Sequence, residues 1–408
     1  MKILIISLFY LPEPVARPHD LAISLVQSGH HVSVITAFPN YPNGKIYPGY
    51  RIGSAKWEDI DGVKVLRIPH LVDRSKSAFK RILSYLSFSL SAVLYSLLRM
   101  EKPDVLWTYQ IGLPGLILSK LLQIPLVHEV QDLWPEWGNN AKLGLGKVAY
   151  HILERQEQMI YRQAHKIVTI TEGFKTVFIN KRTDPSKIEI IPNWANDAIF
   201  HPDKADAELA LKEGFIGNFN IVYIGNVGVA QALGVIIDAA VQLKDFPEIL
   251  FSIIGDGLER AELENRAYVN GVNNVRFLGS RSQNEAAKYM ALADVLFIHL
   301  KRDPVYKITI PSKTYGYLAS GRPILAAAEG ELNDLIKKHQ AGIVCPPQDA
   351  SALANAVRKF RKMPKEELEK MGNAGYHAAK DNYSRSALGK QYSDLFENTV
   401  KSFREEKT

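Results

Sequence analysis

A short apolar run, residues 221–224, leads into a glycine-bearing turn and then into a helical pattern. The turn holds Gly225 and Gly228, and glycine lets a backbone approach a ligand closely. The free N–H groups in the first turn of the following helix form an anion site. The segment therefore predicts a phosphate or diphosphate site. A plain tight turn has the same spacing, and the pattern matches neither a dinucleotide fingerprint nor a P-loop.

A cluster of cations and a hydroxyl follows the apolar run 295–300. Lys301 and Arg302 come directly after it, and Ser312 and Lys313 then open a helical pattern that stops at Gly321. A cation at the start of a helix opposes the helix dipole, so Lys313 needs a reason to be there. Two adjacent phosphates bound at this helix start would explain the lysine. The simpler alternative is that Lys313 is a solvated surface lysine.

Two aspartates stand where other apolar runs end. Asp256, between Gly255 and Gly257, either lines a ligand site or only forms the turn. Asp132 follows the run 125–129, and ligands bind at such strand ends in open α/β sheets. Its carboxylate is suited to orient an acceptor hydroxyl or to take part in acid–base catalysis. It is equally suited to cap the next turn.

Several kinds of site are missing from the sequence. No Asp-x-Asp pair ends a strand to hold a metal–diphosphate complex, and the serine-hydrolase, H-E-x-x-H and protein-kinase motifs are absent. These absences predict that no metal and no cofactor take part. Cys345 is the only cysteine, which excludes a disulfide framework and a thiolate zinc site and suits a reducing cytosol.

The overall charge is mildly positive. The chain has 408 residues, with 50 Lys and Arg against 43 Asp and Glu, which gives a net charge of +7. This excess fits an anionic partner or a membrane surface, but it is too weak to indicate a nucleic-acid-binding protein.

Short apolar runs alternate with helical patterns along the whole chain. Near-continuous runs of Val, Ile and Leu separated by helices predict parallel sheets covered on both faces, an α/β fold. The alternation falls into two series. We expect one domain over residues 1–205, a second over 206–383, and a final amphipathic helix over 384–408.

One helical segment, residues 82–98, carries no charge and is preceded by Lys80 and Arg81 and followed by Arg99. Its five serines and two tyrosines disfavour a membrane span. A buried core helix and a helix lying at a membrane interface or facing the acceptor both fit.

Taken together, these segments resemble the retaining GT-B glycosyltransferases of family 4. Within them, the closest likeness is to the bacterial envelope-polysaccharide branch with L-fucosamine and N-acetylated amino-sugar transferases. The matching segments occur in the family's order over nearly the whole chain: residues 1–14, 29–50, 132–135, 169–174, 191–194, 225–233, 254–258 and 310–323.

The resemblance implies two Rossmann-like domains with parallel sheets facing across a cleft, and a C-terminal helix that crosses back to the first. It implies that the second domain binds a nucleotide-diphosphate sugar, a UDP-sugar by preference. The first would bind a polyprenyl-diphosphate-linked acceptor at the inner membrane face, in the synthesis of surface glycans such as O-antigen or capsule. The expected protein is cytoplasmic, peripheral on the inner membrane and independent of metal.

The resemblance also implies roles for particular residues. The diphosphate would lie against the segment from Gly225 to Gln231, which includes Asn226 and Gly228, and against Lys313. The reaction would retain the anomeric configuration, with the leaving phosphate helping to remove the acceptor proton. We assign catalytic roles to Asp132 and Lys313. The donor site would be formed by Gly225, Asn226, Gly228, Gln231, Asp256, Arg302, Ser312 and Lys313.

The chain departs from the family at several of these positions. Asn226 and Gln231 stand where many relatives carry an arginine and a lysine, and Ile308 and Gly316 replace two glutamates. Gln131 replaces a histidine that often precedes the acceptor-side aspartate. A nucleotide-sugar 2-epimerase and a non-catalytic partner subunit that binds a sugar nucleotide are the alternatives.

Overall fold

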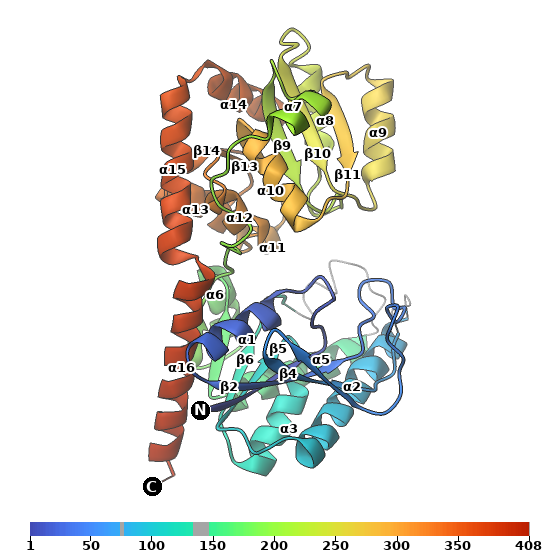
Figure 1. Ribbon diagram of the computed structural model, residues 1–408, viewed down its shortest axis with the longest axis vertical. Coiled ribbons are helices and arrows are strands. Elements are labelled where there is room, and N and C mark those ends of the chain that lie inside the picture. Colours follow the sequence, from blue (N-terminus) through green and yellow to red (C-terminus); the bar gives the residue numbers. More distant parts are fainter. Residues whose placement is uncertain (74–76, 134–146, 408) are drawn as a thin grey trace. The chain divides into compact units, whose positions relative to one another are not determined.

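The computed structural model (Figure 1) describes residues 1–73, 77–133 and 147–407. The chain forms two compact units. Unit 1 comprises Met1–Pro192 together with Arg385–Thr408, and unit 2 comprises Asn193–Ser384.

The described part of unit 1 contains a sheet in the order β3-β4-β2-β1-β5-β6-β7-β8, parallel except for the antiparallel edge strand β3. Its inner strands are buried on both faces, which explains their continuous apolar runs. The strands are β1 (Lys2–Ser7), β2 (His31–Ala37), β3 (Lys56–Ile60), β4 (Val63–Ile68), β5 (Val105–Tyr109), β6 (Leu126–Glu129), β7 (Lys166–Thr169) and β8 (Ile188–Ile190).

Helices cover both faces of this sheet. Figure 1 shows α1 and α16 on one face and α2, α3 and α5 on the other. The helices are α1 (Arg17–Gln27), α2 (Ala78–Arg99), α3 (Leu113–Leu122), α5 (Lys147–Gln163), α6 (Glu172–Asn180), the 3₁₀ helix η1 (Pro185–Lys187) and α16 (Arg385–Glu405).

Unit 2 is built on an all-parallel sheet in the order β11-β10-β9-β12-β13-β14. Its strands are β9 (Phe219–Ile224), β10 (Ile249–Ile254), β11 (Val275–Gly279), β12 (Val295–His299), β13 (Ile324–Ala327) and β14 (Gly342–Cys345). Its helices are α7 (Ala207–Lys212), α8 (Gly234–Val241), α9 (Arg260–Val269), α10 (Gln283–Leu292), α11 (Pro304–Lys307), α12 (Lys313–Ala319), α13 (Glu331–Lys338), α14 (Ala350–Lys362) and α15 (Lys365–Asn382).

Two apolar cores lie on the opposite faces of the unit 2 sheet. Ile221 and Tyr223 of β9 pack into one core with α8 and α14, whereas Val222 packs into the other with α10 and α12. This division follows from the alternation of side chains along a strand. The same alternation places the Tyr223 side chain, near the end of β9, on the face that α8 and α14 cover.

The predicted α/β class with parallel sheets is confirmed. The predicted apolar runs coincide with strands to within a few residues, but the β3–β4 hairpin and the short strand β8 were not predicted. The strand β3 is a largely exposed edge strand with three charged residues in five, so it has no continuous apolar run.

The structure divides the chain at Pro192, earlier than the predicted boundary at residue 205. The segment after Pro192 belongs to unit 2 because it packs there. Ala195 pairs with Ser384, Phe200 lies against Gly316, and Pro202 lies against Gly321.

The last described helix, α16, returns to unit 1 and packs on α1. Tyr392 on α16 contacts the centre of unit 1, where the Arg17 guanidinium and the Glu129 carboxylate form a buried ion pair with Nε and Oε1 2.9 Å apart. Arg17 also donates to the hydroxyl of Tyr392 at 2.7 Å and to the carbonyl oxygens of Ile191 and Pro192. The Tyr392 hydroxyl in turn donates to Glu129.

We expect Glu129→Gln to destabilise unit 1. The substitution leaves the buried Arg17 guanidinium without a counter-charge, and breaking a buried ion pair in this way costs about 3–5 kcal/mol. Denaturant unfolding followed by circular dichroism measures the loss. Glu101→Gln is the matched control, because the Glu101–Lys2 pair is exposed and should contribute nothing measurable. Equal midpoints for the two variants would contradict the assignment.

Candidate functional site

The turn after β9 in unit 2 packs directly on the turn after β10. The N–H of Gly225 donates to the carbonyl of Ile254 at 2.8 Å, and the N–H of Val227 donates to the carbonyl of Asp256 at 2.9 Å. Gly225 and Gly255 have φ angles of +139° and +146°, which favour glycine. A Cβ on Gly255 would overlap the carbonyl oxygen of Gly225. The close approach of the two turns therefore requires glycine.

Lys313, the first residue of α12, places its ammonium beside this turn. Its Nζ donates to the Tyr223 hydroxyl at 2.7 Å and lies 4.0 Å from the centroid of the Tyr223 ring. A Cβ added to Gly225 would overlap the same Nζ. Burial lowers the pKa of Lys313 to about 7. The site thus holds a cation that lacks a carboxylate in hydrogen-bond contact among the described residues, and an anionic ligand would stabilise its charged form.

Two tyrosines hold the end of β9 in place. The Tyr223 hydroxyl accepts from Lys313 and donates to the carbonyl of Asn226 at 2.6 Å. The Tyr317 hydroxyl, from α12, bonds both the N–H and the carbonyl of Ile224, at 2.7 and 3.1 Å. Burial raises the pKa of both tyrosines, so they remain neutral donors. They tie α12, and with it Lys313, to the turn.

His299 fixes the far side of the same turn. Its Nδ1 donates to the carbonyl of Gln231 at 2.6 Å, and its Nε2 accepts from the N–H of Gln348 at 2.9 Å. Burial lowers the pKa of His299 to about 4, so the ring is neutral. The side chains of Gln231 and Asn226 bond each other at 3.2 Å, with Gly228 directly against the Asn226 amide.

The other predicted donor residues have other contacts or are exposed. Asp256 accepts from the N–H of Gly257 at 2.8 Å and lies 3.6 Å from Arg260, which is the geometry of a turn-forming residue. Arg302 directs its guanidinium to Glu329, with Nε and Oε1 3.4 Å apart. Ser312 precedes α12 with its hydroxyl exposed and unbonded to the helix backbone. The structure therefore groups Gly225, Asn226, Gly228, Gln231 and Lys313 most closely.

Ile308 and Gly316, the two positions at which the resemblance implies glutamate, lie at the end of α11 and within α12. Gly316, in α12, faces the ring of Phe200, which a Cβ would meet at 3.4 Å. Ile308 ends the short helix α11. The Phe200 ring therefore lies in van der Waals distance of any side chain at position 316.

In unit 1, Asp132 lines a cavity of about 270 Å³ at the carboxyl ends of β1, β5 and β6. Its Oδ2 accepts from the Gln110 side chain at 3.1 Å. Burial raises the pKa of Asp132, and no cation pairs with it among the described residues. We call this cavity the unit 1 pocket.

The walls of the unit 1 pocket are mainly apolar and come from the strand ends and from helices α2 and α5. Behind Asp132, Gln131 donates to the Glu129 carboxylate at 2.7 Å and accepts from the Tyr109 hydroxyl at 3.2 Å. The strand-end loop is therefore anchored to the buried pair of Arg17 and Glu129. Other lining residues are Leu8, Phe9, Arg81, Ile82, Tyr85, Leu86, Ile111, Leu113, His128, Val130, Leu153 and Ile160.

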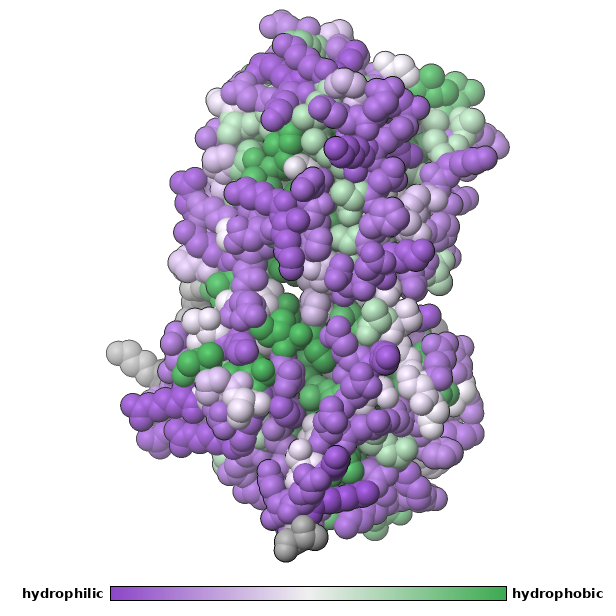
Figure 2. All heavy atoms as spheres, turned by 90° about the vertical axis from the view of Figure 1, so that its left-hand side faces the viewer, coloured by the Kyte–Doolittle hydropathy of each residue, from purple (hydrophilic) through white to green (hydrophobic). Residues whose placement is uncertain are grey.

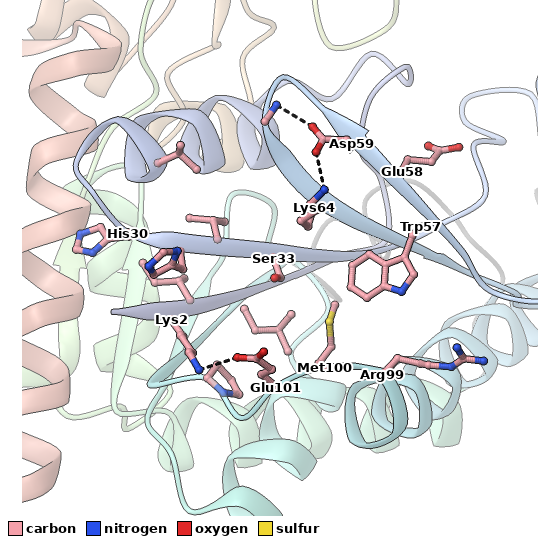
Figure 3. Close-up of a pocket in the computed structure, with 17 residues that line it drawn as sticks. Lys2, His30, Ser33, Trp57, Glu58, Asp59, Lys64, Arg99, Met100 and Glu101 are labelled. Carbon is pink, nitrogen blue, oxygen red and sulfur yellow. Dashed lines mark hydrogen bonds and ion pairs between the residues drawn. The ribbon is translucent and has the colours of Figure 1, made fainter.

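A larger cavity of about 930 Å³ lies elsewhere in unit 1 (Figure 3). Its lining includes the beginnings of β1 and β2 and the end of α2, away from the carboxyl ends of the strands. Two of its lysines are already paired, Lys2 with Glu101 and Lys64 with Asp59. This cavity holds none of the predicted site residues.

No group of three or more His, Cys, Asp or Glu side chains among the described residues is placed to hold a metal ion. The predicted independence from metal stays a prediction. Two residues of the predicted acceptor motif, at 134 and 135, lie outside the described residues.

The sequence did not single out several residues that shape these sites. Tyr223, Tyr317 and Gln348 were missed, and so was the pairing of Arg17 with Glu129. A tyrosine at the end of a buried strand is the one available signal, since its hydroxyl usually finds a partner when buried.

Both halves of the chain match glycosyltransferase families. Residues 14–194 match the model described as "Glycosyl transferase 4-like domain", and residues 212–378 match "Glycosyl transferases group 1". The chain is 29% identical over 391 residues to WcaI of Escherichia coli (strain K12), a protein named as a colanic acid biosynthesis glycosyl transferase. The match covers 90% of this chain and 93% of WcaI.

Solved structures show the same fold. Sucrose-phosphate synthase from Thermosynechococcus elongatus superposes with a TM-score of 0.75 at 18% identity, covering 98% of this chain and 100% of that one. Anabaena Alr3699/HepE, solved in complex with UDP-glucose, superposes with a TM-score of 0.71 at 16% identity and the same coverage. At these identities the likeness establishes the two-domain GT-B architecture.

We expect Gly225→Ala to lower both stability and affinity for inorganic pyrophosphate. The new methyl group would displace the Lys313 ammonium, and the backbone strain alone costs about 1–3 kcal/mol. Thermal unfolding and calorimetric titration measure the two effects.

Gly217→Ala is the control, because Gly217 also has a positive φ, +79°, but open space around it. It should lose some stability and keep its pyrophosphate affinity. Unchanged affinity in Gly225→Ala would remove this turn from the anion site.

Proposed function

Because the chain is a glycosyltransferase with the GT-B fold, we propose that it moves a sugar from a UDP-sugar to a polyprenyl-diphosphate-linked acceptor. In this proposal the reaction serves bacterial surface-glycan synthesis, retains the anomeric configuration and needs no metal. The observation that carries it is the Lys313 ammonium, half-buried beside the glycine turn of unit 2 without an acidic partner in contact among the described residues.

The donor side of the proposal rests on the chemistry of this turn. A diphosphate that leaves during transfer gains negative charge, and fixed donors aimed at it stabilise the transition state. Lys313 supplies the charge, and the Asn226 and Gln231 amides supply further donors nearby. The HepE structure holds UDP-glucose on the same fold, which supports a UDP-sugar as donor here.

The acceptor side rests on Asp132 in the unit 1 pocket. A carboxylate with a raised pKa at a strand end is suited to accept a hydrogen bond, or a proton, from an attacking hydroxyl. Gln110 holds the carboxylate in place from one side. We therefore propose that Asp132 orients the acceptor hydroxyl.

Helix α2 supports a location on the membrane surface. One face of α2 packs on the sheet through Phe88 and Ala92, both fully buried, so α2 is in part the expected core helix. The opposite face exposes an apolar row, which we call the α2 leucine row: Phe79, Leu83, Leu86, Leu90, Leu94, Leu97 and Leu98.

Residues 79–99 form the one described helix that is long and apolar enough to span a membrane, with 28% of its apolar window buried. A row of this kind is rare on a soluble protein and suits insertion into the interface of a bilayer. By contrast, hydrophilic side chains cover most of the face drawn in Figure 2. We propose that the α2 leucine row contacts the inner membrane.

We expect the purified protein to transfer sugar from a UDP-sugar only when a lipid-diphosphate-linked acceptor is present, with or without EDTA. Mass spectrometry identifies the product from a panel of donors and acceptors, and NMR identifies its anomer. Asp132→Asn should lower kcat by about 100-fold, a typical loss for an acid–base group, and leave donor binding intact. Sugar transfer at the wild-type rate by Asp132→Asn would contradict the acceptor assignment, and binding without turnover across the panel would contradict the function.

We expect affinity for the UDP-sugar to fall as pH rises above about 7. Lys313 is charged below its lowered pKa, and a bound diphosphate favours the charged form, so binding above that pH requires uptake of a proton. The dissociation constant should rise about tenfold per pH unit, until the pKa of the complex is passed. Calorimetry over pH 6–9 measures it. Lys313→Ala should bind weakly at every pH; if its pH profile matches that of the wild type, Lys313 is not the titrating group.

A further inference from the structure

We propose that Arg81 binds the phosphate group that joins sugar to lipid in the acceptor, and so acts as a positioning residue of the unit 1 pocket. This inference rests on the proposed function and adds a site to it. Among the described residues, Arg81 is the guanidinium that lines this pocket, and a lipid-linked substrate carries a phosphate that needs a cation.

Arg81 has no acidic partner among the described residues. Two acidic residues, Asp132 and Glu157, are among the described residues that line the pocket, and the contacts given for both are with residues other than Arg81. Glu157 accepts from the Tyr161 hydroxyl and pairs with Lys181 Nζ, both at 2.5 Å, and Asp132 accepts from Gln110. The guanidinium therefore adds an uncompensated positive charge to the pocket wall.

The surroundings of Arg81 make an anionic ligand more favourable. Ile82 and Leu86, from the same helix, line the pocket with it, and Phe9 lines it from the end of β1. A phosphate gains more from a guanidinium beside apolar walls than in open water, because the local dielectric is lower. The planar guanidinium also bonds phosphate through two parallel N–H groups.

Along the pocket, the groups match the parts of a lipid-linked sugar. Asp132 offers a carboxylate to a sugar hydroxyl, Arg81 offers a cation to a phosphate, and Leu86 belongs both to the pocket and to the α2 leucine row. A substrate with a sugar, a phosphate and an isoprenoid chain has the same three chemistries. A phospholipid headgroup in the bilayer shares only the phosphate with this substrate. Binding of the lipid-linked sugar and binding of a headgroup can therefore be told apart by the ligands that Arg81 is needed for.

The test uses farnesyl diphosphate as probe, with farnesol as its uncharged counterpart, in calorimetric titrations of the full chain. Arg81→Gln should bind farnesyl diphosphate at least roughly tenfold more weakly, as expected for a lost charge-assisted hydrogen bond, and bind farnesol unchanged. Arg81→Lys should recover part of the loss.

Lys80→Gln is the matched control, because Lys80 is exposed, adjacent and absent from the pocket lining. It should keep its farnesyl diphosphate affinity. The titrations contain excess UDP, which fills the donor turn around Lys313, so that the probe reports the unit 1 pocket. Circular dichroism verifies that each variant folds.

Three results would overturn the proposal. In the first, Arg81→Gln and Lys80→Gln bind farnesyl diphosphate equally. In the second, excess UDP abolishes binding of the probe, which would place it at the donor turn. In the third, Arg81→Gln loses only binding to vesicles of phosphatidylethanolamine and phosphatidylglycerol, which would make Arg81 a headgroup contact.

The sugar-transfer assay keeps this proposal separate from the proposed function. Transfer to a lipid-linked acceptor with an unchanged KM in Arg81→Gln would overturn the subsite and leave the function standing. Arg81-dependent binding of farnesyl diphosphate without transfer by the wild type would overturn the function and leave the subsite standing.

Discussion

The buried pair of Arg17 and Glu129 is the interaction on which unit 1 depends. It joins the start of α1, the end of β6 and the chain segment at Ile191 and Pro192, and Tyr392 adds α16. Two charges removed from water repay their desolvation only when every remaining donor and acceptor is satisfied. That condition fixes the geometry around the end of β6. Gln131 donates to Glu129 and so ties the loop that carries Asp132 to the same pair.

Unit 2 depends on a different constraint, the close approach of two backbones. Gly225 and Gly255 have positive φ angles and allow the turns after β9 and β10 to touch, because a Cβ on Gly255 would overlap the carbonyl oxygen of Gly225. The space they leave is occupied by the Lys313 ammonium, held by the ring and hydroxyl of Tyr223. Unit 1 therefore neutralises its buried cation with Glu129, whereas the described residues of unit 2 place no carboxylate in hydrogen-bond contact with Lys313.

The sequence predicted the fold well because most of its signals are local. Apolar runs and glycine stops located the strands and helices, and the opposed helix dipole singled out Lys313 before any contact was known. Contacts between residues far apart in the sequence cannot be read from local patterns, so the ion pair of Arg17 with Glu129 was not predicted. Gly316 illustrates the same limit: the departure from the family was visible, but the Phe200 ring that accompanies it required the structure.

The return of α16 to unit 1 sets an order of events during protein synthesis. The side chains of Arg17, Asp20 and His30 leave the ribosome early, but their partners Tyr392, Arg385 and Ser393 follow only after all of unit 2 has been made. Until then, a nascent unit 1 lacks the packing of α16 on α1 and the Tyr392 hydroxyl that accepts from Arg17. Nascent chains thus have a long interval in which chaperones can bind the first unit, while unit 2 can already fold as a continuous segment.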